Sequence, residues 1–210
     1  MWATFRKDAL FVNAPFSDDY SELFRAIIFA LIACGRQPRC ALEEEDGGEI
    51  RLVKIARLIA DSGASIHDIS YVQLDPKVNL PRFNMPFELG MVMGAKLVAR
   101  GRAFSSRPIL ILENESFSFQ KCLSDISGQD AKPHNGSPTA VLSIIRNWIR
   151  SADKTAKVPG DMQLKRYFQR FNEQLPDICK LAHTSADSIS YFDLIGFMQA
   201  WLDDEASMVR

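Results

Sequence analysis

The chain has 210 residues, a net charge of −1 and a hydrophobic content of 47%. This length and content suit one domain, or one domain with an appendage, and supply enough apolar side chains for a real core. The near-zero charge argues against the global basic field that a nucleic-acid-binding or anionic-membrane-binding protein would carry.

The cysteines and histidines do not indicate a metal site. The four cysteines, at positions 34, 40, 122 and 179, form no C-x-x-C pair, and the three histidines are scattered. The N-terminus has no long apolar stretch of the kind found in signal peptides, and the most hydrophobic helix candidate, residues 23–34, is too short to span a bilayer. We therefore expect a cytoplasmic protein with reduced thiols, without a metal and without a membrane or nucleic-acid partner.

The first half of the chain alternates between expected strands and helices. Residues 9–16 are an apolar run that breaks at a proline, as a buried strand followed by a loop would. A helix is expected over 17–35, a second strand over 38–42 after it, and an acidic loop over 43–48. The next helix, over 49–63, precedes a third strand over 65–70. In this second helix the side chains expected to point inward are those of Leu52, Val53, Ile55, Ala56 and Ile59.

The same alternation continues to about residue 152. A helix is expected over 87–101, with Asn84 as its N-cap and Pro86 in its first turn. Residues 107–114 form the clearest strand, and a helix over 137–151 has Ser137 as N-cap. Apolar strands that alternate with helices indicate a parallel sheet covered on both faces. We expect an α/β domain over 1–152, with about five strands in a flavodoxin-like order.

The C-terminal quarter is expected to be a separate helical extension. The polar segment 152–160 ends in Pro-Gly and has the composition of a linker. Residues 160–210 are expected to form two or three helices. Their aromatic side chains, such as Phe168, Phe171 and Trp201, can pack on each other or on the α/β domain.

Polar residues at the expected strand ends define a candidate site, because open α/β sheets bind ligands outside the carboxyl ends of their strands. Strand one ends in Asn13-Ala14-Pro15-Phe16 and strand three in Asp68-Ile69-Ser70. Glu88 lies in the first turn of the helix that follows strand three, so we expect it on the same edge. The predicted site residues are Glu88 and Asp68 as catalytic groups, with Asn13, Pro15, Phe16, Ser70, Arg82 and Asn84 as binding groups.

Each of these residues also has a purely structural interpretation. A carboxylate in the first turn of a helix interacts favourably with the unpaired N–H groups there, by roughly 0.3 to 1 kcal/mol. Glu88, between Phe87 and Leu89, could do no more than that, or it could bind ribose, act as a nucleophile or stabilise a cationic sugar. Asp68 could cap a loop, Asn84 a helix, and Arg82 could be a solvated loop residue or a phosphate contact. The sequence has no G-x-G-x-x-G, P-loop, H-E-x-x-H or serine-elbow motif.

Three segments resemble the clan that joins Toll/interleukin-receptor (TIR) domains to nucleoside 2-deoxyribosyltransferases. They are FVNAPFSDDY (11–20), SIHDIS (65–70) and RFNMPFELG (82–90), and residues 124–150 are similar to the closing segment of bacterial TIR-like proteins. In the TIR-like enzymes an essential glutamate lies in the first turn of the helix after strand three, in a context similar to Phe87-Glu88-Leu89, and in the transferases the nucleophilic glutamate precedes Leu-Gly. The resemblance also implies that an Asp at the end of the preceding strand, matching Asp68, helps to bind the base or sugar. Here Met-Pro-Phe stands where TIR enzymes usually carry Trp-Cys, and Asn13-Ala14-Pro15-Phe16 stands where the transferases usually carry Tyr or Asp.

The resemblance implies one of three functions. The first is cleavage of the N-glycosidic bond of NAD or a related nucleotide, with NAD as substrate and no separate cofactor, in a role such as bacterial anti-phage defence. The second is exchange of bases on a deoxynucleoside. The third is a non-catalytic nucleotide-sensing or assembly module. The partners that the resemblance implies are a nucleotide or nucleoside, a second copy of the chain and a component of a defence system.

Overall fold

Five strands form one all-parallel sheet in a computed structural model that describes residues 5–44, 46–71, 80–98 and 102–208. The strand order is β2-β1-β3-β4-β5, and every neighbouring pair is parallel. The strands are β1 (Arg6–Asn13), β2 (Gln37–Arg39), β3 (Ser62–Asp68), β4 (Ile109–Glu113) and β5 (Lys132–Pro133). The predicted α/β class with a flavodoxin-like order is confirmed.

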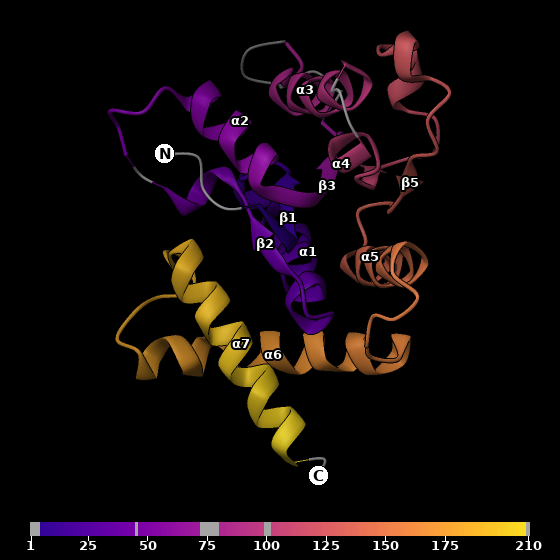
Figure 1. Ribbon diagram of the computed structural model, residues 1–210. Coiled ribbons are helices and arrows are strands. Elements are labelled where there is room, and N and C mark those ends of the chain that lie inside the picture. Colours follow the sequence, from indigo (N-terminus) through magenta and orange to yellow (C-terminus); the bar gives the residue numbers. More distant parts are fainter. Residues whose placement is uncertain (1–4, 45, 72–79, 99–101, 209–210) are drawn as a thin grey trace.

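Helices cover both faces of this sheet (Figure 1). On one face, α1 (Ser21–Ala33) and α5 (Pro138–Ala152) pack against Leu10 and Val12 of β1. On the other face, α2 (Arg51–Asp61) and α3 (Asn84–Val98) pack against Phe11, beside the short α4 (Arg102–Ser105). Successive strand side chains point to opposite faces. Because of this alternation, strand-end residues can share a site only if they lie on the same face of the sheet.

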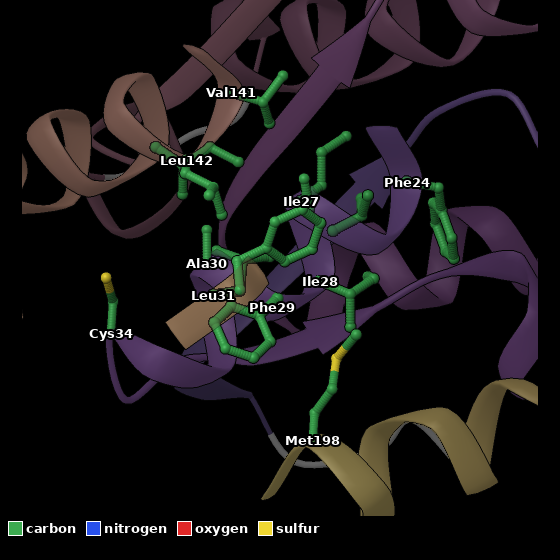
Figure 2. Packing of buried hydrophobic residues seen from close by; sticks show 14 of the residues in the cluster. Phe24, Ile27, Ile28, Phe29, Ala30, Leu31, Cys34, Val141, Leu142 and Met198 are labelled. Atoms are coloured by element: carbon green, nitrogen blue, oxygen red, sulfur yellow. The ribbon is translucent and has the colours of Figure 1, made fainter. Parts of the chain in front are cut away.

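The C-terminal helices α6 (Asp161–Leu181) and α7 (Tyr191–Met208) lie outside α1 and α5 (Figure 1). Figure 2 shows side chains of α1 between Val141 and Leu142 of α5 and Met198 of α7. The ring of Phe29, at the centre of α1, contacts aromatic rings of both C-terminal helices, namely Phe168, Phe171 and Trp201. The predicted extension therefore shares one continuous core with the α/β part.

The start of α2 differs from the prediction. The helix begins at Arg51, and Leu52 and Val53 are about half exposed, at 47% and 52%, instead of pointing inward. The buried apolar side chains of α2 lie further along, at Ile55, Leu58 and Ile59. The reason is the phase of the helix: Leu52 and Val53 lie on the side of α2 that carries the partly exposed Ala56 and Arg57, away from the buried side.

The end of β2 also differs from the prediction. The predicted second strand, 38–42, ends at Arg39 and is followed by a single 3₁₀ turn, Ala41–Glu43. Ser137 caps α5 as predicted, since its hydroxyl oxygen accepts a hydrogen bond from the Ala140 amide at 3.3 Å.

None of the helices within the described ranges combines the length and the apolar composition that crossing a membrane requires.

Candidate functional site

A cavity of about 320 Å³ opens at the carboxyl edge of the sheet. It lies where the strand order reverses, because the chain passes from β1 to β2 on one side and returns to β3 on the other. This is the place where open α/β sheets bind ligands. Six of the eight predicted site residues line the cavity: Asn13, Pro15, Phe16, Arg82, Asn84 and Glu88.

Glu88 is the buried acid of this cavity. Glu88 is only 6% exposed. No hydrogen bond or ion pair joins its carboxyl group to any residue that the structure describes. Burial raises the pKa of the Glu88 carboxyl to about 7, although the positive charge of Arg51 opposes the shift. At neutral pH this carboxyl is therefore poised between its protonated and ionised forms.

The helix-dipole explanation of Glu88 does not fit its position. The helix α3 begins at Asn84, three residues earlier than predicted, so Glu88 lies in the second turn and no acidic residue is in the first. The stabilisation of a carboxylate by the helix N-terminus falls off within the first turn. For the same reason Asn84 is not the N-cap: it is already helical, and Phe87 donates its amide hydrogen bond to the carbonyl of Phe83.

Asn13, the last residue of β1, is held in place by two acceptors. Its amide nitrogen donates to the Met85 carbonyl at 2.8 Å and to Nδ1 of His67 at 3.0 Å. A carbonyl can only accept, so the nitrogen must face Met85, and the amide oxygen is left without a hydrogen bond among the described residues. Asn13 lines the cavity, so this oxygen is an acceptor for a ligand hydroxyl.

His67 is a structural partner of Asn13. It is fully buried, and burial lowers its pKa to about 3, so the ring is neutral and accepts from Asn13. Its Nε2 has no hydrogen-bond partner in the described part of the chain. The neutral ring thus fixes which way the Asn13 amide faces.

Asp68, predicted as a catalytic group, does not line the cavity. It is fully buried in a polar network instead, where it accepts hydrogen bonds from the Tyr20 hydroxyl, from the Ser70 amide at 2.8 Å and from Nε2 of His134 at 3.0 Å. Burial acts to raise the pKa of the Asp68 carboxyl, but the bonds from His134, Ser70 and Tyr20 outweigh it and the pKa is lowered. The Asp68 carboxylate therefore has a structural role, because its hydrogen bonds go to groups of the protein itself.

Strand geometry explains this correction. Asn13 and His67 are paired in register and bond to each other on the face that α3 covers. Asp68 is the next residue along β3, so its side chain points to the opposite face, toward Tyr20 and His134. The prediction placed all strand-end residues on one edge without separating the two faces.

Ser70 belongs to the same polar network as Asp68. Its hydroxyl lies 2.9 Å from Nε2 of His134, and it does not line the cavity. These three residues are not a catalytic triad, because Ser70 and Asp68 both approach the same ring nitrogen. The other nitrogen, Nδ1, accepts from the Gly136 amide at 3.0 Å. A triad needs the serine and the acid on different nitrogens.

Two cationic side chains line the cavity, and the sequence analysis named only one. Arg82 lies over the Tyr71 ring, 5.7 Å from its centroid. Arg51, the first residue of α2, was not predicted, because the expected helix began at residue 49 and the end of β2 was placed three residues too late. The same rule that identified Asn13 points to Arg51, since it opens the helix that follows the carboxyl end of β2.

A second cavity, of about 210 Å³, lies at the amino edge of the sheet, opposite the edge where open α/β sheets bind ligands. Lys7, Gly63 and Pro108 line it near the starts of three strands, together with Trp148 of α5. Within the described ranges, no three His, Cys, Asp or Glu residues come together in a way that could hold a metal ion.

Fold and cavity together define an α/β protein with a buried carboxylate, which has no partner among the described residues, at the carboxyl edge of a parallel sheet. Comparison of the sequence with models of protein families and with curated proteins gives no match.

Proposed function

We propose that the protein cleaves the N-glycosidic bond of NAD or a related nucleotide, with Glu88 as the carboxylate that meets the ribose. The observation that carries this proposal is the buried Glu88, which lines a cavity of about 320 Å³ and has no partner among the described residues. An ionisable group in such a setting is costly to the fold unless it is used. Pockets that bind small molecules start at about this size.

The cleavage reaction requires few catalytic groups from the protein. The bond between C1′ of the ribose and the nicotinamide nitrogen breaks, and its electron pair stays on the nitrogen, which becomes neutral. The sugar carbon becomes cationic, and the Glu88 carboxylate stabilises that charge. Water then adds at C1′ and releases a proton. Positioning and electrostatics supply most of the catalysis, because nicotinamide is already a good leaving group.

The neighbours of Glu88 suit a ribosyl ligand. The free amide oxygen of Asn13 accepts a hydrogen bond from a sugar hydroxyl, and Phe16, which is 39% exposed, offers a ring for the base. The positive charge of a nicotinamide ring would lower the pKa of Glu88 on binding, since an opposite charge favours the ionised form. The substrate therefore helps to create the carboxylate that it needs.

The resemblance to TIR-like enzymes and deoxyribosyltransferases supports the same assignment, because the Phe87-Glu88-Leu89-Gly90 segment is similar to the context of their essential glutamate, although Glu88 lies in the second turn of α3 and not in the first. A role in anti-phage defence is part of the proposal on that ground alone. Base exchange on a deoxynucleoside is the second candidate, and the observation that favours it is again the unpartnered carboxylate. As a nucleophile, Glu88 would attack C1′ and hold the sugar covalently until a second base displaced it.

Mass spectrometry separates these candidates. Purified protein is incubated with NAD, and separately with a deoxynucleoside plus a free base, at low and high protein concentration. Release of nicotinamide is the expected result. Exchange of bases without nicotinamide release would replace cleavage by the transferase function. A folded protein that is inactive in every incubation would contradict both enzymatic proposals and leave a nucleotide sensor.

A further inference from the structure

The first turn of α2 carries positive charge that no hydrogen bond or ion pair within the described residues satisfies, although the charge of Arg51 does act on Glu88. No side chain caps this helix, and no acidic residue lies in its first turn. The amides of Val53 and Lys54 donate to the Ile50 carbonyl, but those of Arg51 and Leu52 have no acceptor among the described residues. Arg51 adds a full positive charge to a helix end that is already positive.

Three acids close to Arg51 in the sequence form ion pairs with other arginines. Glu44 and Glu49 both pair with Arg57, and Glu43 pairs with Arg39. Arg51 itself makes no hydrogen bond or ion pair with any described residue, and it lines the same cavity as Glu88.

The cavity that Arg51 lines is independently equipped for a ligand. Glu88 and Asn13 are 6% and 3% exposed, and both line it with carboxylate or amide oxygens that have no described partner. Such oxygens accept hydrogen bonds from hydroxyl groups, and an arginine beside a free helix N-terminus binds phosphate. One ligand satisfies both ends if it carries sugar hydroxyls and a phosphate.

We propose that Arg51 and the N-terminus of α2 form an anion subsite that selects a phosphorylated nucleoside over the free nucleoside. This inference rests on the proposed function, because the sugar end of the ligand is the end that Glu88 and Asn13 receive. It narrows the substrate to a nucleotide and disfavours a free deoxynucleoside.

The test compares two ligands that differ only by a 5′-phosphate. Reduced nicotinamide mononucleotide and reduced nicotinamide riboside are suitable, because the reduced ring is a poor leaving group and the ligands stay intact. Calorimetry measures both with wild type, with Arg51→Gln and with a control, Arg166→Gln. Arg166 is exposed on α6 and does not line the cavity, so its loss changes the net charge equally without touching the site.

The wild type is expected to prefer the mononucleotide by roughly ten- to hundredfold, as a charged hydrogen-bonded contact provides. Arg51→Gln should remove that preference while Arg166→Gln keeps it. The inference is overturned if Arg51→Gln weakens both ligands equally, because Arg51 would then only balance Glu88. It is also overturned if the wild type binds neither ligand or both alike. An Arg51-dependent preference in a protein that never cleaves NAD would sustain the subsite and reject the cleavage proposal.

Discussion

Three buried carboxylates of this chain differ in what surrounds them. Asp68 accepts hydrogen bonds from Tyr20, Ser70 and His134, and Glu113 accepts from the amides of Phe117 and Ser118 at 3.1 and 3.0 Å. Glu88 has no such donors within the described residues. Asp61, which is 3% exposed, also has an oxygen without a described partner, but its charge acts on Arg107 and it does not line the cavity. Glu88 is the buried acid that lines the cavity without a described partner, a setting that destabilises the fold unless the charge is used.

The raised pKa of Glu88 makes stability depend on pH. An unfolded glutamate ionises near pH 4.5, whereas the folded group holds its proton to about pH 7. Its contribution is therefore fully present below pH 4.5 and is lost as the pH rises to about 7, by roughly 2 to 3 kcal/mol. Denaturant unfolding of wild type and Glu88→Gln across this range measures the difference. If their difference in unfolding free energy does not change with pH, the carboxyl is not desolvated.

Asp68→Asn tests the correction to the predicted site. Asparagine presents an NH₂ group to the donors that now bond to the carboxylate, so one or more buried groups lose their partner. The expected loss is roughly 2 to 3 kcal/mol in the free energy of unfolding. Any nicotinamide release per folded molecule should be unchanged. Loss of activity at full stability would return Asp68 to the catalytic group.

At the scale of elements, the sequence predicted the helices and strands better than their ends. The periodicity located α1, α2, α3 and α5, but α3 begins three residues early and the first turn of α2 turns its apolar side chains outward. Leu52 and Val53 are exposed because they lie on the side of α2 opposite its buried residues, and the apolar pattern alone did not fix that phase. Arg51 and the separation of Asp68 from Glu88 were missed for another reason, since both depend on where strands end and which face they present.

The C-terminal helix α7 is tied to the strand that leads into the cavity wall. The Tyr191 hydroxyl donates to the Pro38 carbonyl of β2 at 3.1 Å, and Ala41, three residues further on, lines the cavity. The Tyr191 ring also lies 6.3 Å from Phe24, which in turn contacts Phe16 of the cavity at 5.3 Å. The C-terminal helices thus support one side of the candidate site.

Tyr191→Phe should lower the free energy of unfolding by about 1 kcal/mol, because it leaves a buried carbonyl without its donor. Tyr167→Phe is the matched control, since the Tyr167 hydroxyl bonds only to Gln163, one turn earlier in α6, at 2.9 Å. That change should cost less. Thermal or denaturant unfolding compares the two, and equal losses would show that the contact with β2 adds nothing to stability.

For the whole molecule, the sequence predicted a parallel α/β sheet with appended helices, but not a common core. Phe29 is completely buried because α6 and α7 supply the rings around it, whereas the helical pattern alone shows only that α1 is apolar on most sides. Such an all-apolar helix indicates burial on both sides. Which later segment covers it depends on contacts more than 130 positions apart in the sequence, and these leave no local pattern.

The measurement that tests the account most directly is nicotinamide release from NAD by Glu88→Gln and Glu113→Gln beside the wild type, with the unfolding free energy of each. We expect Glu88→Gln to abolish release and, at pH 8, to be at least as stable as the wild type, because an amide replaces an unpaired buried charge. Glu113→Gln should lose stability and keep its activity. A Glu88→Gln protein that still releases nicotinamide at the wild-type rate, or that only loses stability, would contradict the assignment of Glu88 to a site.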